Sequence, residues 1–503
     1  MRVSPTTTDG GLSRRRLWGF RLAAVALGLS VFVMTEGVCF LFDWGRPADH
    51  DDPFVGFSAI HPLFALNRDR DRYEIARSRR QFFAAESFPA HKSPRTLRVF
   101  CLGGSTVQGR PFSRQTSFTT WLQLNLTAAD SSRNWEIVNC GGISYASYRL
   151  VPILQECLEY EPDLFIICTG HNEFLEERTY GPIKHVSPAY RTVQETVGRL
   201  RTYQLLRAAM LTSLGRNPQS QPQNLPILKD EVDAILDYRN GLEAYHRDDR
   251  WRTGVIAHFA CNLRRMIAIA RTNGVPVILI RPPSNLRDTP PFKSQHRDGL
   301  TAAELRDWKS MVTRARSHFD DDLTLSTQLF EQATVLDARY AAAWYELGRC
   351  YEGLGRYADA RRAFVKARDE DICPLRIVTP IEQLIVSIAE QTGTPLVDAA
   401  KLLEHQASTG ISGGLMLADH VHPSIRGHQL IADALAAMMV QQGWVHPAAG
   451  WQQRRTTAYR AHFQSLDSIY FARGRRELKS LEAWAHGRAD GPLFDRVPTL
   501  SGR

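Results

Sequence analysis

The sequence predicts an α/β protein with three layers, α/β/α, around a doubly wound parallel sheet. From Thr96 onward, apolar runs alternate with stretches of helical periodicity, and such βα units form parallel sheets with helices on both faces. The first run, Val99–Leu102, ends in two glycines and a hydroxyl residue, the pattern of a buried strand that breaks into a tight turn. Strands are expected at Leu97–Leu102, Trp135–Asn139, Leu164–Thr169, Val277–Ile280 and Leu396–Asp398, with helices between them such as Tyr148–Leu158 and Val255–Arg271.

Length and composition indicate a globular protein of more than one unit. The chain of 503 residues is too long for one ordinary core, and its 43% apolar and 23% charged residues are typical of folded proteins. The net charge of +9 is spread along the chain without a zinc-finger or RNA-binding signature, so we expect no nucleic-acid partner. An anionic phospholipid surface or an acidic polysaccharide is compatible with this charge. The eight cysteines form no CxxC pair and no metal-ligand spacing, so we expect neither metal nor cofactor, while disulfides stay open.

The N-terminal region contains a segment long enough to cross a membrane. Residues 22–42 are apolar or small except at Thr35–Gly37, and as a helix they span about 31 Å. Arg14–Arg16 and Arg21 precede this segment, so we expect a cytoplasmic N-terminus and an extracytoplasmic, periplasmic domain. Glu36 argues against a membrane position, but it lies near the outer end, where a carboxylate costs less. A cleaved signal peptide is the alternative, and we favour an uncleaved anchor because no small-residue cleavage site follows cleanly.

These patterns divide the chain into successive segments. The lead-in after the anchor is polar and punctuated by proline, so we expect it to be extended, and Leu214–Pro226 is expected to be a surface loop. The expected divisions are a basic cytoplasmic segment at 1–21, the anchor at 22–42, the lead-in at 43–95, the α/β domain at 96–286 and 376–442, an insertion at 287–375 and a helical tail at 443–503.

The insertion contains a helical repeat. Phe330 and Ala333 recur as Phe364 and Ala367, both at an interval of 34 residues. With the intervening pattern Trp344-Tyr345-x-Leu347-Gly348-x-x-Tyr351, this period resembles the tetratricopeptide repeat, a helix-turn-helix unit. So short an array cannot bury its apolar face alone, so it docks on a protein partner or braces the fold. The amphipathic tail Tyr459–Ala485 is one candidate surface for it.

Four polar stretches follow predicted strands or precede a predicted helix. They are Gly103-Gly104-Ser105, Asn139–Tyr145, Gly170-His171-Asn172-Glu173 and Asp419-His420-Val421-His422-Pro423. Ligands bind at the carboxyl edge of open α/β sheets, which is where these stretches are expected. Nucleophilic catalysis needs a hydroxyl, a base, a carboxylate that orients the base, and donors for an oxyanion, and these stretches supply each part. Alone, Ser105 is equally compatible with a helix N-cap.

Together, the order and spacing of these stretches resemble the SGNH hydrolases, or GDSL-type esterases. The resemblance implies that Ser105 is the nucleophile, His422 the general base and acid, and Asp419 its orienting carboxylate. It further implies an oxyanion hole formed by Asn172 with the backbone N–H groups of Ser105 and of the second stretch. It covers roughly residues 96–439 without the insertion, and an SGNH-like sheet is the implied fold.

Two departures from the family pattern bear on this site. The aspartate that usually precedes the nucleophile is absent, since Gly104 stands there. In the second stretch, Ser144 occupies the position that is usually glycine, and Gly142 is the alternative backbone donor. An α/β-hydrolase elbow is excluded, because Val107 replaces the final glycine of Gly-x-Ser-x-Gly.

The remaining polar residues near these stretches are candidates for the walls of the substrate pocket. We expect His171 and Glu173 to form walls of the substrate pocket, and Arg281 and Arg376 to reach the cleft, where Arg281 would bind an anionic group of the substrate. For Arg281, a proline-stiffened structural loop is equally compatible with the sequence. A His-x-His metal pair at 420 and 422 lacks a third ligand, so no metal is expected.

The sequence therefore predicts a single-pass membrane protein with an extracytoplasmic serine esterase or acyltransferase domain. Its substrate would be an acyl ester, with an envelope or exported polysaccharide as the candidate carrier, and hydrolysis and O-acyl transfer differ only in the acceptor. The alternative is a binding scaffold, in which the cleft recognises without turnover and the repeat holds a protein partner.

Overall fold

A computed structural model describes residues 14–42, 44, 60–176, 197, 200–213, 228, 231–237 and 241–486. The predicted loop at 214–226, most of the predicted segment 1–21 and the end of the tail after residue 486 lie outside the described residues. Contacts divide the chain into two units, one formed by Met1–Pro53 with His185–Leu225 and the other by Phe54–Lys184 with Pro226–Arg503.

The larger unit is built on a five-stranded parallel sheet with the strand order β5-β4-β6-β7-β8. The expected strands are confirmed, with ends that differ by no more than two residues from the prediction. Gly103 of β4 pairs with Gly141 of β5 and with Cys168 of β6, so the carboxyl ends of these three strands are level. The bounds are β4 Thr96–Gly103, β5 Asn134–Gly141, β6 Leu164–Cys168, β7 Val277–Arg281 and β8 Leu396–Asp398.

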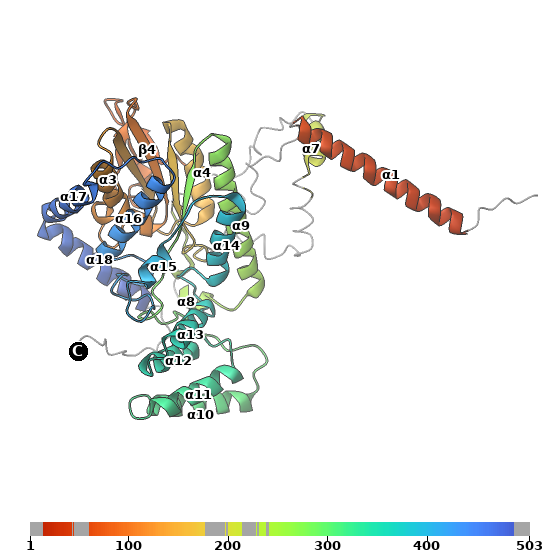
Figure 1. Ribbon diagram of the computed structural model, residues 1–503. Helices are drawn as coiled ribbons and strands as arrows, with labels where there is room; N and C mark the ends of the chain where they lie inside the picture. The colour runs from red at the N-terminus through yellow and green to blue at the C-terminus, as the bar shows by residue number, and fades with distance from the viewer. Residues whose placement is uncertain are drawn as a thin grey trace, which may run out of the picture. The chain divides into compact units, whose positions relative to one another are not determined.

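Helices cover both faces of this sheet, so the predicted three-layer α/β/α fold is confirmed (Figure 1). Side chains alternate across a strand, and accordingly Phe100 and Leu102 enter one hydrophobic core while Val99 and Cys101 enter the other. The first core includes residues of α4 Ser147–Cys157, α9 Asp249–Thr272 and α14 Thr379–Thr392; the second includes residues of α3 Phe118–Ala129, α16 Ile425–Gln441 and α17 Trp451–Ser465.

The lead-in is not simply extended, which corrects the expectation from its polar composition. Its described part forms a small antiparallel sheet of β1 Phe64–Leu66, β2 Arg72–Ile75 and β3 Ser87–Pro89. The charged run after Leu66 makes the turn between β1 and β2, with Arg70 in the left-handed region at φ 57°. The side chains of Phe64 and Phe88 pack edge to face and enter the first core. Phe64, Ile75 and Phe88 of this sheet are buried, whereas Leu66 is exposed.

The insertion consists of helices α10 Ala302–Ser317, α11 Leu323–Leu336, α12 Ala341–Gly353 and α13 Tyr357–Asp369. Phe330 and Phe364, which are separated by the 34-residue interval, are both buried. A Cβ atom on Gly348 would lie 2.7 Å from the Phe364 ring, so glycine is needed where α12 and α13 cross. Tyr345 and Phe364 share a cluster with Leu286 and Ile411, which joins the insertion to the α/β domain. Whether it is a tetratricopeptide repeat stays a prediction.

The tail packs against the α/β domain. Tyr459 of α17 packs against Trp121 of α3, with the ring centroids 4.9 Å apart. The Thr116 and Tyr470 hydroxyls are hydrogen-bonded at 2.8 Å, which holds α18 (Ser468–His486) against the loop that precedes α3. The other short helices in the described part of this unit are α2 Ser105–Gln108, α8 Gly241–Ala244 and α15 Ala399–Glu404, with single 3₁₀ turns at Arg77–Arg79, Arg114–Thr116, Leu158–Tyr160 and Ile235–Asp237.

The smaller unit contains the helices α1 Arg14–Leu41 and α7 Arg201–Ser213. Within α1, residues Phe20–Leu41 have a mean hydropathy of 2.0 and are long and apolar enough to cross a membrane. Such a helix near an N-terminus is either a membrane anchor or a signal sequence.

Candidate active site

Ser105 lies where β4 gives way to α2, at the carboxyl edge of the sheet. The two preceding glycines permit this turn, because a Cβ atom on Gly103 would lie 2.2 Å from the Cys168 carbonyl oxygen. One on Gly104 would lie 2.6 Å from the Asn172 Nδ2 atom. Since Ser105 is the first residue of α2, its backbone N–H has no partner within that helix.

His422 links Ser105 to Asp419. The His422 Nε2 atom lies 2.7 Å from the Ser105 Oγ atom, and the His422 Nδ1 atom lies 2.7 Å from Asp419 Oδ2. The other carboxylate oxygen of Asp419 accepts the backbone N–H groups of Val421 and His422, at 2.9 and 2.8 Å. The structure thus brings together the three residues of the expected triad, with the hydrogen-bonding pattern of a nucleophile, a base and an orienting acid.

The electrostatics of the site keep Asp419 ionised. Burial alone would raise the pKa of Asp419, but the nearby His422 and His420 rings and the hydrogen bonds from His422 hold that pKa well below its usual range. Burial, together with the neighbouring His422, lowers the pKa of His420 to about 4, although Asp419 opposes this. Burial also lowers the pKa of His428 to about 3. Asp419 is therefore ionised at pH 7, while His420 and His428 are neutral.

The expected oxyanion hole is assembled in part. The Asn172 Nδ2 atom donates one hydrogen bond to the Tyr145 carbonyl at 3.0 Å, which leaves its second N–H beside Gly104. Ser144 has φ 63°, in the left-handed region, and no acceptor for its backbone N–H is found among the described residues. The alternative donor Gly142 is a wrong prediction, because its N–H already donates to the Gly103 carbonyl at 3.0 Å.

His171 and Glu173, expected to be pocket walls, are buried. His171 Nδ1 accepts the Ile377 N–H at 3.1 Å, and burial with the neighbouring His420 and His422 rings lowers the His171 pKa to about 3. Glu173 accepts the backbone N–H and the hydroxyl of Ser147, at 3.0 and 2.8 Å, at the start of α4. Glu173 is therefore a structural anchor for α4, and its expected contact with the pocket is wrong.

The two arginines expected to reach the cleft are engaged elsewhere. The Arg281 Nε atom donates to Asp398 Oδ1 at 2.8 Å, across the neighbouring ends of β7 and β8. Arg376 is buried and donates to the carbonyls of Asn285 and Thr289, at 2.8 and 2.6 Å. Both side chains hold the strand ends and loops in place, so the structure gives neither of them a free guanidinium in the cleft.

Sequence reasoning missed Arg110, which follows the turn of Ser105. Its backbone N–H donates to the Ser105 carbonyl at 3.2 Å, and burial lowers its pKa while the charge of Asp419 opposes that effect. The side chain forms an ion pair with Glu477 of α18. The position of a basic residue five residues after Ser105 could have pointed to Arg110. Its partner Glu477 lies in the tail, however, and no sequence pattern connects Arg110 with Glu477.

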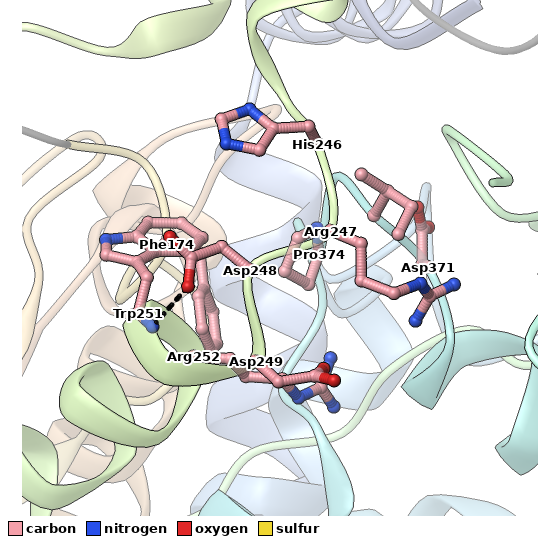
Figure 2. A pocket seen from close by; sticks show the side chains of 10 residues that line it. Phe174, His246, Arg247, Asp248, Asp249, Trp251, Arg252, Asp371 and Pro374 are labelled. Atoms are coloured by element: carbon pink, nitrogen blue, oxygen red, sulfur yellow. Dashed lines mark hydrogen bonds between the residues drawn. The ribbon is translucent and has the colours of Figure 1, made fainter. Parts of the chain in front are cut away.

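A hollow of about 30 Å³ elsewhere in this unit is lined by charged residues (Figure 2). Phe174 and Trp251 pack edge to face on one side of it, with ring centroids 5.4 Å apart. The Asp248 carboxylate accepts the Trp251 N–H at 2.8 Å, which caps α9. None of Ser105, Asp419 and His422 lines this hollow, and its small volume makes it a packing seam at the start of α9.

No family model and no curated protein matches the chain. Solved structures that resemble it include an acetylxylan esterase from Geobacillus stearothermophilus (14% identity, 70% of this chain and 96% of that chain, TM-score 0.31), a lipolytic protein of the G-D-S-L family from Desulfitobacterium hafniense (12%, 68% and 98%, 0.29) and a lipase/acylhydrolase from Enterococcus faecalis (12%, 70% and 100%, 0.32). The three-layer fold is shown by the five-stranded sheet and the helices on its two faces.

Proposed function

We propose that the protein is a membrane-anchored, extracytoplasmic serine esterase or O-acyltransferase of the SGNH type. The observation that supports this function is the chain of hydrogen bonds from Ser105 Oγ through the His422 ring to Asp419, with 2.7 Å at each step. An isolated helix cap at Ser105 requires no such chain, whereas an activated serine does.

The reaction begins when Ser105 Oγ attacks the carbonyl carbon of the ester and His422 Nε2 takes the hydroxyl proton. Asp419 accepts the His422 Nδ1–H and stabilises the imidazolium that forms. The tetrahedral oxyanion is stabilised by the backbone N–H of Ser105 and the second N–H of Asn172, and the Ser144 N–H is the third donor. His422 then protonates the leaving alkoxide, which leaves an acyl-serine.

The acyl-serine is released by the reverse sequence of proton transfers. His422 takes a proton from water or from an acceptor hydroxyl, and the resulting oxygen nucleophile attacks the acyl carbon. The serine leaves with the proton that His422 returns. Water gives a free acid, and a sugar hydroxyl gives a new ester. We propose an acyl ester on an envelope or exported polysaccharide as the substrate.

The anchor in this proposal is α1, with its N-terminus in the cytoplasm. Trp18 lies near the start of α1 and Trp44 lies three residues after its end, and aromatic side chains at such positions favour the membrane–water interfaces. Its outward-facing apolar side chains suit a lipid environment, and the arginines before Leu22 favour the cytoplasmic side.

The second candidate is a binding scaffold, favoured by a groove of about 620 Å³ on the insertion. Met311, Val335 and Leu336 line this groove together with Glu331 and Arg297. Val335 is strongly exposed for an apolar side chain, which is typical of a surface that meets a partner. In this proposal the tetratricopeptide-like region holds a protein partner.

Labelling by a fluorophosphonate separates the two functions. The full-length protein, its Ser105→Ala variant and its His422→Ala variant are treated in membranes with a fluorescent fluorophosphonate. We expect labelling of the wild type alone, because the probe reacts with a serine that a base has activated. Ser424→Ala is the matched control, since Ser424 caps α16 and should leave labelling intact. A folded wild type without labelling would refute the enzyme and favour the scaffold.

A further inference from the structure

The carboxylate of the membrane helix α1 has its partners in α7. Glu36 Oε1 accepts the Arg201 backbone N–H at 2.5 Å, and Glu36 Oε2 accepts the N–H and the hydroxyl of Thr202, at 3.0 and 2.6 Å. These donors belong to the first turn of α7, whose N–H groups have no partners within the helix. The positive end of the helix dipole adds to the attraction for the carboxylate. Glu36 therefore acts as an N-cap that α1 supplies to α7.

Further contacts fix α7 on one side of the outer end of α1. Arg201 donates to the Cys39 carbonyl at 3.2 Å, and its guanidinium lies 5.0 Å from the centre of the Phe40 ring. Cys39 is only 3% exposed, whereas the neighbouring Val38 and Phe40 are exposed. In Figure 1, α7 lies beside the end of α1 that is farthest from the N-terminus. α7 thus supplies hydrogen-bond donors to the half-buried carboxylate near the outer end of the apolar stretch.

Several large apolar side chains of α7 are exposed. Leu206 is 71% exposed and Met210 is 66% exposed, and Tyr203 and Leu205 are exposed as well. Within the described residues, nothing covers these side chains. An apolar face of this kind on a helix that is docked on a membrane segment continues the lipid-facing surface of that segment.

The lengths indicate how deep α7 lies. Glu36 stands about 8 Å along the helix axis from Leu41, the outer end of the apolar stretch. The 13 residues of α7 make a helix of about 20 Å, which is too short to cross the hydrocarbon core of about 30 Å. A helix end at this depth needs partners for its backbone N–H groups, because lipid supplies none, and Glu36 provides them.

We propose that α7 is a second membrane-embedded element, which inserts into the outer leaflet beside α1 with Leu206 and Met210 facing lipid. This inference rests on the proposed anchoring by α1. It gives a reason for the carboxylate at position 36, because Glu36 is the docking group for α7. The chain between β6 and α9 then returns to the membrane, so the protein is held at two points.

Photocrosslinking to lipid tests this inference on the full-length protein. p-Benzoylphenylalanine replaces Leu206, Val33 or Leu415 in separate samples, each reconstituted into vesicles of phosphatidylethanolamine and phosphatidylglycerol with a radiolabelled phospholipid. Val33 of α1 is 66% exposed and reports on the anchor, and Leu415 of the larger unit is 70% exposed and is matched to Leu206. We expect radiolabelled lipid on the Val33 and Leu206 samples and none on the Leu415 sample.

The outcomes separate the two proposals. Lipid at Val33 without lipid at Leu206 would overturn the insertion of α7 and leave the anchor standing. No lipid at either position would overturn the anchor itself. A crosslink from Leu206 to a second protein chain would mean that the apolar face binds protein, and would also refute the proposal.

A variant of the docking group tests the role of Glu36. Glu36→Gln keeps the side-chain size but removes the charge and one acceptor oxygen, so α7 loses part of its cap. We expect the lipid crosslink at Leu206 to fall while the crosslink at Val33 is unchanged. An unchanged Leu206 crosslink would mean that α7 inserts without Glu36, contrary to the docking role.

Discussion

The Asp419→Asn substitution replaces one carboxylate oxygen by an NH₂ group. It should abolish turnover while leaving the size of the side chain almost unchanged. The asparagine oxygen can keep the bonds from the Val421 and His422 N–H groups, and its NH₂ group then faces His422 Nδ1, 2.7 Å away in the wild type. Two N–H groups cannot face each other, so Nδ1 must become the acceptor and the ring must carry its proton on Nε2. That atom faces Ser105 Oγ and can no longer accept the serine proton.

The expected loss is about 10⁴-fold in kcat, or about 5.5 kcal/mol of transition-state stabilisation, by analogy with the same tautomer defect in serine proteases. The free energy of unfolding should change far less. One charge-assisted hydrogen bond is lost, which costs about 1.5–3 kcal/mol, and the two backbone hydrogen bonds persist. The variant should therefore fold and bind substrate but not react.

The assay measures hydrolysis of an aryl acetate and the rate of fluorophosphonate labelling, with thermal unfolding recorded in parallel. Asp398→Asn is the matched control, because Asp398, at the end of β8, is likewise a carboxylate that accepts a side-chain N–H, from Arg281 Nε, and a backbone N–H, from Lys401. It should lower stability modestly and leave kcat unchanged. If Asp419→Asn keeps kcat within a few fold of the wild type, or if Asp398→Asn loses as much, the orienting role of Asp419 is refuted.

Three further predictions concern the oxyanion hole, a buried ion pair and pH. Asn172→Ala should lower kcat about 100-fold or more, because a donor to the oxyanion is lost, and full turnover would remove Asn172 from the proposed hole. Glu176→Gln should lower the free energy of unfolding by about 3–5 kcal/mol in urea titrations, because it removes the charge of a carboxylate that is buried in an ion pair with Arg149; a loss below 1 kcal/mol would mean that water screens the pair. His171 and His420, with pKa values lowered to about 3 and about 4, stay neutral in the folded chain but protonate near pH 6.5 when unfolded. The unfolded state therefore binds more protons between pH 6.5 and 4, and stability should fall by about 1.4 kcal/mol per residue for each pH unit of acidification in this window. A thermal midpoint that is flat from pH 7 to pH 5 would contradict this.

The sheet was predictable from the sequence because its strands are buried on both faces. A strand that is covered on both faces has no position for a polar side chain, so it appears in the sequence as a continuous apolar run. Val99–Leu102 is such a run, and its residues are buried. The lead-in was not predictable in this way. Its strands contribute single residues such as Phe64 and Phe88 to the core, and the polar residues between them hide that pattern.

The parts of the site that were predictable from the sequence are those formed by residues close together in the chain. The glycines before Ser105 indicate a tight turn, because a larger residue would not fit there. The short spacing between Asp419 and His422 indicates that a single turn can bring the two side chains together. Gly142 is a different case. Its N–H is free in any sequence-based interpretation, and only the pairing of the neighbouring strands shows that Gly103 takes it.

The sequence by itself determined the α/β layers, the apolar N-terminal helix and the residue types at the end of each strand, because burial and turn geometry act on neighbours along the chain. Only the tertiary structure decided which partners the arginine side chains near the site have. From the sequence, Arg281 and Arg376 were expected to reach the cleft. In the structure, Arg281 donates to Asp398 and Arg376 donates to the Asn285 carbonyl. Arg110 forms an ion pair with Glu477 of the tail. Partners so distant in the chain meet only after folding, because close packing, and not local propensity, brings them within hydrogen-bond distance.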